Sequence, residues 1–206
     1  MKIFRSTERK GKVEIMKTNR ILCAAMLACV LAMSAATVND REFKGVTFPD
    51  TEMIGSTQVK LVGIGLRKVL VISVYLGALY MEKPSSDPAE VISSDQTKRV
   101  VLHFIYKEVS SEELVKKYDE GFKKNAADKI PALKDQIATF FGYFTEPVKR
   151  GETIVITYLP GTGTEVSVKG KVRGVIPGKD FMEALFSVWF GKYPPSGDLK
   201  KGMLGG

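Results

Sequence analysis

The order of hydrophobic periodicities along the chain constrains the fold most. Residues 55–66 alternate with the period of a β-strand, whereas residues 110–125 and a segment from about Ile130 place their apolar residues on one helical face. Residues 152–160 and 165–177 then return to period two, and a further helical region completes the chain. Strands, two helices, strands and final helices predict an α+β domain, whose antiparallel sheet is covered on one face by helices.

Capping signals indicate where the helices begin and end. Ser110 with Glu113, and Asp180 with Glu183, have the spacing of a capping box, so we expect a helix to start at each pair. Pro131 is acceptable in the first turn of the helix that begins near Ile130. Gly191 is expected to end the helix that Asp180 starts. Residues 169 and 170, Lys-Gly, predict the turn of a hairpin within residues 165–177.

Residues 65–84 place one arginine, Arg67, before about a dozen nearly continuous apolar residues. Their β-branched and aromatic content favours a strand with both faces apolar, which would be covered on both sides. Residues 99–106 have the same character, and we interpret His103 within them as a core residue more readily than as a catalytic base. The Arg67 guanidinium is either a surface charge at a strand end or a fixed cation at the mouth of an apolar cavity.

The N-terminal 36 residues have the order of a secretory signal peptide. Lys17 and Arg20 precede the apolar run of residues 21–33, and Ser34 to Ala36 supply small residues for cleavage. The run is shorter than the roughly 20 residues that a membrane span needs. We therefore expect a bacterial Sec-type signal, a periplasmic or secreted protein, and one domain over residues 37–206 without a membrane span. An uncleaved anchor, a lipoprotein at Cys29 and a start at Met16 remain alternatives.

Charge and composition exclude several classes of function. Residues 1–36 carry seven Lys/Arg and two Asp/Glu, so the net charge of +8 falls to +3 for residues 37–206, which removes the main support for nucleic-acid binding. Cys23 and Cys29 both lie in the predicted signal, and His103 is the single histidine. We therefore expect no disulfide, no metal and no cofactor, in a protein that is a monomer.

Several blocks of sequence resemble the bacterial branch of the chalcone isomerase-like family, over residues 42–205. The blocks are GVTFPD from Gly45, GIGLRK from Gly63, VYLGALYMEKP from Val74, YLPGTGTEVSVKGK from Tyr158, IPGKDFMEALFSVWFG from Ile176 and DLKKGMLG from Asp198. The resemblance implies an open-faced β-sandwich, in which helices cover one face of a large antiparallel sheet.

The resemblance also implies roles for single residues. Arg67, after its Gly-Ile-Gly turn, is similar to an arginine in the active cleft of plant chalcone isomerases, and Tyr75 is similar to a tyrosine that holds the carboxylate in fatty-acid-binding members. Active isomerases place a threonine where Tyr75 stands, a tyrosine and an asparagine at the positions of Leu114 and Gly121, and a threonine or serine near Val188. The catalytic set is therefore reduced to the arginine.

These observations predict a non-catalytic binding protein for a fatty acid or a similar small apolar carboxylate. Arg67 and Tyr75 would hold the carboxylate, although eight residues of straight strand would separate them by roughly 26 Å, so we expect a bend between Lys68 and Val71. The predicted cavity walls are Val74, Tyr80, Phe104, Leu114, Tyr118, Phe140 and Phe144. Two alternatives stay open: an isomerase or lyase acting on a chalcone-like phenolic enone with Arg67 and Tyr75 or Tyr80, and a structural envelope protein without a ligand.

Overall fold

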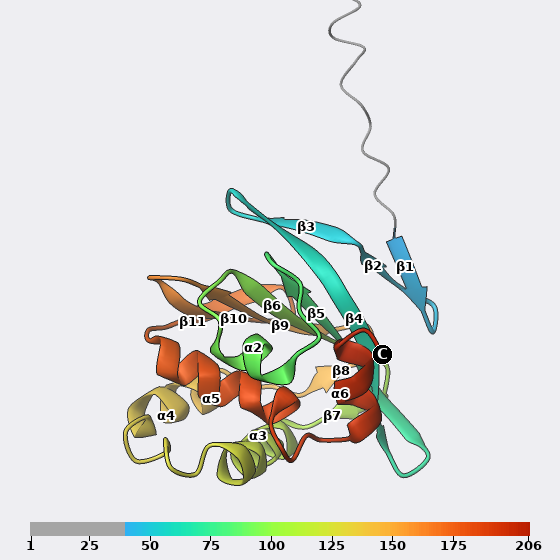
Figure 1. Cartoon of the computed structure of the whole chain (residues 1–206). Coiled ribbons are helices and arrows are strands. Elements are labelled where there is room, and N and C mark those ends of the chain that lie inside the picture. Colours follow the sequence, from blue (N-terminus) through green and yellow to red (C-terminus); the bar gives the residue numbers. More distant parts are fainter. Residues whose placement is uncertain (1–39) are drawn as a thin grey trace, which may run out of the picture. The chain divides into compact units, whose positions relative to one another are not determined.

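A seven-stranded antiparallel sheet forms the centre of the domain (Figure 1). The computed structural model describes residues 40–206, so the predicted signal peptide of residues 1–36 lies outside the described residues. In spatial order the strands are β11 (Lys171–Ile176), β10 (Gly163–Val168), β9 (Thr153–Leu159), β6 (Lys98–Phe104), β5 (Ile72–Met81), β4 (Thr57–Val69) and β3 (Thr51–Ile54). The sheet brings β5 and β6 to its middle, where their side chains face both layers.

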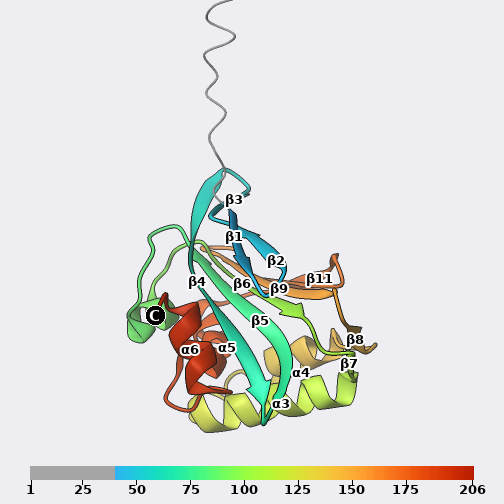
Figure 2. The ribbon, with the colours of Figure 1, turned by 90° about the vertical axis from the view of Figure 1, so that its right-hand side faces the viewer.

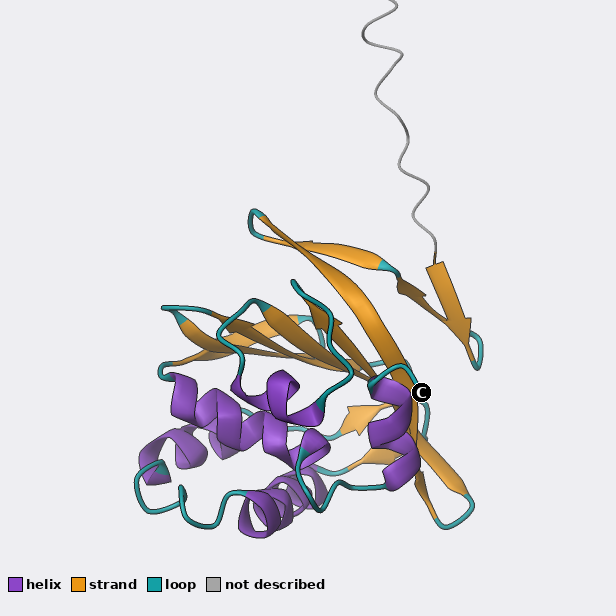
Figure 3. Cartoon of the chain, viewed as in Figure 1, coloured by secondary structure: helices purple, strands orange, loops and turns teal. Residues whose placement is uncertain are grey.

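Helices cover one face of this sheet, as the α+β prediction requires (Figure 3). They are α2 (Pro88–Ser93), α3 (Ser111–Asn125), α4 (Lys134–Gly142), α5 (Lys179–Phe190) and α6 (Gly197–Met203). Val100, Leu102 and Phe104 alternate along β6 and pack with the apolar faces of these helices in the larger core. None of the described helices is both long and apolar enough to cross a membrane.

A hairpin of β1 (Asp40–Phe43) and β2 (Val46–Pro49) belongs to the opposite side of the sheet (Figure 2). Phe48 of this hairpin packs with Leu61, Leu76 and Tyr80 in a second, smaller apolar cluster. A further short pair, β7 (Glu108–Val109) with β8 (Val148–Lys149), closes the end of the domain. Helices on one face and a small cover on the other make this the open-faced β-sandwich that the sequence predicts.

The chain reverses within residues 65–84, so the predicted single strand there is wrong, whereas the bend predicted between Lys68 and Val71 is confirmed. Strand β4 continues through Gly65 to Val69, residues Leu70 and Val71 form a two-residue turn, and β5 returns beside β4. Leu70 has a φ of 53°, in the left-handed region that glycine or asparagine usually occupies. No residue of the usual turn types marks this reversal, which is why the periodicity does not reveal it.

Gly63 and Gly65 do not end or bend the strand; they allow α6 to lie directly on it. A Cβ at Gly63 would lie 2.2 Å from the carbonyl oxygen of Gly202, and one at Gly65 would lie 2.1 Å from that of Leu199. Only residues without a side chain permit this approach of helix backbone to strand backbone. The Gly-x-Gly spacing is therefore a helix-packing signal, since residues two apart in a strand share one face.

The helix starts differ from the predictions in two places. Residues 127–133 form turns, so α4 begins at Lys134 and not near Ile130. Helix α5 has Gly178, with a φ of 95°, at its N-cap, and no side chain caps it, so Asp180 lies in the first turn instead of forming a capping box. The Ser110 cap is confirmed, because its hydroxyl accepts a hydrogen bond from the Glu113 amide at 3.2 Å. The hairpin turn at Lys169 and Gly170 is also confirmed.

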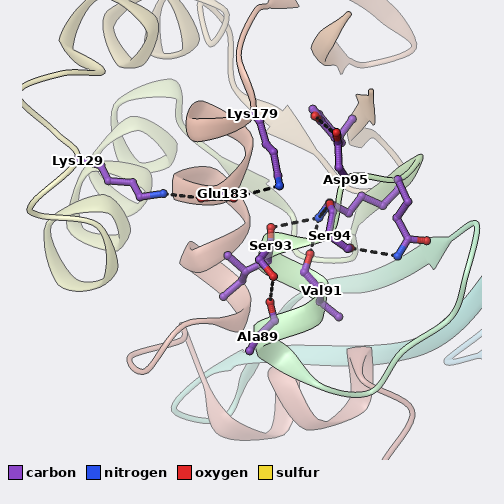
Figure 4. Close-up of polar contacts among 12 residues, drawn as sticks. Ala89, Val91, Ser93, Ser94, Asp95, Lys129, Lys179 and Glu183 are labelled. Atoms are coloured by element: carbon purple, nitrogen blue, oxygen red, sulfur yellow. Dashed lines mark hydrogen bonds and ion pairs between the residues drawn. The ribbon is translucent and has the colours of Figure 1, made fainter. Parts of the chain in front are cut away.

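Lys98 is a fully buried cation that holds the end of α2. Its Nζ donates hydrogen bonds to the carbonyls of Val91 at 2.6 Å, Ile92 at 3.2 Å and Ser94 at 2.9 Å. These are the carbonyls that a helix leaves without partners at its C-terminus. Figure 4 shows Val91 and Ser94 at this end of α2, beside Glu183, whose carboxylate lies between Lys129 and Lys179. Burial lowers the pKa of Lys98 to about 7.

Candidate functional site

A cavity of about 510 Å³ lies between the sheet and helices α3 and α5. The sheet contributes the end of the β4–β5 hairpin and the end of β6, and the helices contribute the inner face of α3 and the last residues of α5. The side chains that form most of its wall are apolar: Val74, Leu102, Phe104, Leu114, Val188 and Trp189. Its volume lies within the roughly 300–1,000 Å³ that is usual for small-molecule sites.

Arg67 and Tyr75 are direct cross-strand partners in the β4–β5 hairpin, and both line this cavity. The reversal at Leu70 and Val71 therefore brings together two residues that a straight strand would separate. A bulge follows between Arg67 and Lys68, where the register of the two strands shifts. Side chains that face each other across an antiparallel pair lie on the same face of the sheet, so a guanidinium and a phenol meet at one place.

The Arg67 guanidinium keeps most of its donors free. Nη1 donates to the main-chain carbonyl of Lys68, and no carboxylate within residues 40–206 forms an ion pair with it. The side chain is half-buried, so the charge lies at the boundary between the cavity and the solvent. An arginine in this state can bind an added carboxylate through two parallel hydrogen bonds.

Tyr75 lies beside this charge as a neutral donor. Burial raises the pKa of its phenol to about 12, although the Trp189 side chain and the Arg67 charge lower it in part. The Tyr75 ring packs against Phe104, with 5.5 Å between ring centroids. Because the phenol keeps its proton throughout the physiological pH range, it can donate a hydrogen bond to an anion.

Tyr118 brings a second hydroxyl to the cavity. It is buried, and its hydroxyl has no hydrogen-bond partner among the residues that the structure describes. Burial raises its pKa well above the usual value, and the nearby Tyr75 adds to that rise. Its ring stacks on Phe144 and packs edge-on to Phe140 and Trp189. A buried hydroxyl without a partner is uncommon and marks a place where a polar ligand atom would be accepted.

Comparison with known proteins decides the family. The model of the chalcone isomerase-like family matches residues 40–205. The chain belongs to the chalcone isomerase-like family. Among solved structures it is similar to a fatty-acid-binding protein from Arabidopsis thaliana, with a TM-score of 0.65 and 18% sequence identity, over 81% of this chain and 96% of that one. At this identity the likeness shows a shared fold. No curated protein matches the sequence.

The positions at which the resemblance to chalcone isomerases implies catalytic residues also lie at this cavity. Leu114, Gly121 and Val188 all line it. A Cβ at Gly121 would lie 2.7 Å from Cγ1 of Val188, so the valine fills the space next to the glycine. None of these three side chains offers a hydrogen-bond donor or acceptor. The polar groups of the inner wall are those of Arg67, Tyr75, Tyr118 and Trp189, and tyrosines and charged residues lie at the mouth.

The structure brings together six of the residues that the sequence suggests for a ligand site. Arg67, Val74, Tyr75, Phe104, Leu114 and Tyr118 line one cavity. Tyr80 does not: it is fully buried in the smaller cluster on the opposite side of the sheet. Tyr75 and Tyr80 are five residues apart in one strand, and an odd separation places side chains on opposite faces.

Three other candidates also lie away from the cavity. Phe140 and Phe144 belong to the core behind Tyr118 instead of the cavity wall. His103 is half-buried, it is not among the lining residues, and burial lowers its pKa. Within residues 40–206 no group of three or more His, Cys, Asp and Glu could hold a metal ion.

Sequence reasoning missed the residues at the mouth of the cavity. Val69 and Ile72 come from the end of the hairpin, Tyr106 follows β6, and Tyr193 follows α5. All four are partly exposed while they line the cavity. The run of four apolar residues from 69 to 72 is the signal that the sequence offers, but the same run is also typical of a buried strand.

Proposed function

We propose that the protein binds a fatty acid or a similar small apolar carboxylate in this cavity without converting it, after export through its predicted signal peptide. The observation that carries the proposal is the pairing of Arg67 and Tyr75 at one place of an otherwise apolar cavity. The similar protein from Arabidopsis thaliana is a fatty-acid-binding protein, which supports the choice of ligand class.

The arrangement suits an amphiphilic acid because charged and apolar groups are separated. Arg67 would donate two parallel hydrogen bonds to the carboxylate, and Tyr75 would donate a further one. The hydroxyl of Tyr118 lies near Tyr75. An alkyl chain against the wall of Leu102, Phe104 and Trp189 gains about 0.8 kcal/mol for each buried CH₂. Ten methylenes would contribute roughly 8 kcal/mol before ordering costs, and the hydrogen bonds from Arg67 and Tyr75 would offset part of those costs.

The test is a titration of delipidated protein with a fluorescent fatty acid. Arg67→Met keeps the length and much of the apolar volume of the side chain but removes its charge, so we expect affinity to fall by about thirtyfold or more, from the loss of charge-assisted hydrogen bonds. Arg150→Met is the matched control, because Arg150 is exposed and does not line the cavity. Circular dichroism verifies that both variants are folded. Equal affinity of Arg67→Met and the unchanged protein would remove the anchor role.

The rival function is an isomerase or lyase reaction on a phenolic enone, with Arg67 as the electrophilic group. It is favoured only by the presence of that arginine at the cavity, since Leu114, Gly121 and Val188 cannot donate or accept a proton. Incubation with a 2′-hydroxychalcone, followed by the enone absorbance, separates the two. Turnover above the spontaneous rate would favour the enzyme, and its absence with tight fatty-acid binding would favour the carrier.

A further inference from the structure

The tip of the β4–β5 hairpin exposes four consecutive apolar residues, Val69 to Ile72. Leu70 is 93% exposed and Val71 is 92% exposed, and Val69 and Ile72 are nearly half-exposed. Figure 1 shows this tip at the lower right, where the two strands extend beyond the rest of the sheet. A contiguous apolar group on a projecting loop needs an explanation that isolated exposed residues do not.

The backbone of the tip makes the choice of residues more unusual. A two-residue hairpin turn favours Asn-Gly or Gly at its first position, because the chain there takes a positive φ. Here Leu70 takes a φ of 53° and Val71 follows it. Asn and Gly would fit this turn conformation with less strain and would also make the tip more soluble. Leu70 and Val71 therefore indicate a surface that contacts another molecule.

The tip adjoins the mouth of the cavity. Val69 and Ile72 line the cavity and are partly exposed, and so are Tyr106 and Tyr193. Tyrosine is enriched where a membrane meets water, because its ring is apolar and its hydroxyl stays hydrated. An apolar loop and two tyrosines around one opening have the composition of a surface that enters the headgroup region of a bilayer.

The charges next to the tip favour an anionic partner. Lys68 directly precedes the tip, is exposed, and has no ion-pair partner between residues 40 and 206. Each of three carboxylates at the mouth already lies near a lysine, although two of them share one: Glu108 lies 3.6 Å from Nζ of Lys149, and Lys117 pairs with Glu113 at 3.6 Å and with Glu120 at 3.2 Å. Lys68 is therefore available to pair with an acidic lipid headgroup.

We propose that the Val69–Ile72 tip docks the protein on an anionic lipid bilayer, with the mouth of the cavity turned toward the membrane. A two-residue turn at the end of a projecting hairpin can enter a fluid surface. It offers little to a second protein, since a standard interface involves about 20–30 residues on each side. Docking in this position would shorten the path of an apolar molecule between the bilayer and the cavity.

The experiment is sedimentation of the ligand-free protein with vesicles of phosphatidylcholine and phosphatidylglycerol. In the variant Leu70→Asn with Val71→Gly, the turn receives the residues that a hairpin favours, so the domain stays folded while the apolar tip is lost. We expect vesicle binding to fall by at least about tenfold. The control is Val172→Asn with Met53→Asn, which changes two residues that are each 60% exposed and that do not line the cavity, and it should bind vesicles as before.

Charge and self-association are tested with the same vesicles. Lys68→Gln should weaken binding to anionic vesicles by about fivefold and change binding to pure phosphatidylcholine little. Equal vesicle binding of the tip variant and the unchanged protein would overturn the proposal. So would a dimer in solution that the tip variant disperses, because the tip would then serve a second copy. The sedimentation contains no fatty acid, so its outcome is independent of the fatty-acid titration.

Discussion

The contact between α6 and strand β4 leads to a stability prediction with an unusually direct geometric basis. A Cβ added at Gly65 would lie 2.1 Å from the carbonyl oxygen of Leu199 and 2.8 Å from its carbonyl carbon. Ordinary contacts begin near 3.4 Å, so in Gly65→Ala the helix must move away by about 1.3 Å. The obstacle is backbone, so no side-chain rotation can relieve it.

The movement also disturbs the apolar contacts of the helix. Leu199 and Met203 of α6 are completely buried, and a displaced helix leaves a gap beneath both. Overpacking of a well-filled core costs about 1–3 kcal/mol, and partial loss of two buried contacts adds to this. We therefore expect Gly65→Ala to lower the free energy of unfolding by about 3 kcal/mol or more.

Two other glycines provide graded controls in the same urea-unfolding assay. A Cβ at Gly77 would meet Sδ of Met203 at 2.8 Å, a flexible side chain that can move, so Gly77→Ala should cost about 1 kcal/mol. Gly142, the last residue of α4, has no atom within 4 Å of such a Cβ, and Gly142→Ala should stabilise by up to about 1 kcal/mol. If Gly65→Ala unfolds at the same urea concentration as the unchanged protein, the close contact of α6 with β4 is refuted.

Two further predictions concern buried polar groups. Lys98 has a pKa lowered to about 7 by burial, so between about pH 7.5 and 9.5 the unfolded chain binds more protons there than the folded one. Urea titrations measure the difference in unfolding free energy between the unchanged protein and Lys98→Met. With increasing pH this difference should rise by up to about 1.4 kcal/mol per pH unit in favour of the unchanged protein. A difference that does not change with pH would contradict the lowered pKa of Lys98. Tyr118→Phe removes a buried hydroxyl that has no hydrogen-bond partner within residues 40–206, so the ligand-free protein should keep its stability or gain up to about 1 kcal/mol. Its fatty-acid affinity should fall by about fivefold in the fluorescence titration, and an unchanged affinity would place that hydroxyl away from the ligand.

Much of the fold could be predicted from periodicity because its helices and strands bury one face each. The helix of residues 111–125 has its cap at Ser110 as expected, and the hairpin of β10 and β11 turns at the expected Lys-Gly pair. The start of α5 could not be found in this way, since Gly178 caps it without a side chain. A side-chain cap such as Ser110 can be recognised from the sequence. A helix start such as that of α5 cannot, because the backbone conformation of Gly178 forms it without a side-chain hydrogen bond.

The candidate site was predicted in part for a different reason. The distance argument predicts a bend between Lys68 and Val71, and the hairpin turn at Leu70 and Val71 provides it as a full reversal of the chain. The hydrophobic pattern does not reveal the hairpin, because the turn residues Leu70 and Val71 continue an apolar run that is typical of a buried strand. The odd separation of Tyr80 from Tyr75 in one strand predicts that the two side chains lie on opposite faces of the sheet. The position of Trp189 cannot be predicted in this way, because it depends on how α5 packs across the sheet.

The packing of Gly121 against Val188 explains how the cavity can differ from that of a catalytic relative. The resemblance to chalcone isomerases implies an asparagine at the position of Gly121 and a hydroxyl side chain near Val188. Here Cγ1 of Val188 occupies the space that any side chain at residue 121 would enter. The two positions are therefore coupled, and together with Leu114 they make that part of the wall apolar. Polar groups remain at Arg67, whose charge lowers the pKa of Tyr75, and at Tyr118, whose pKa the nearby Tyr75 raises; this leaves a charged end and an apolar remainder suited to an amphiphile.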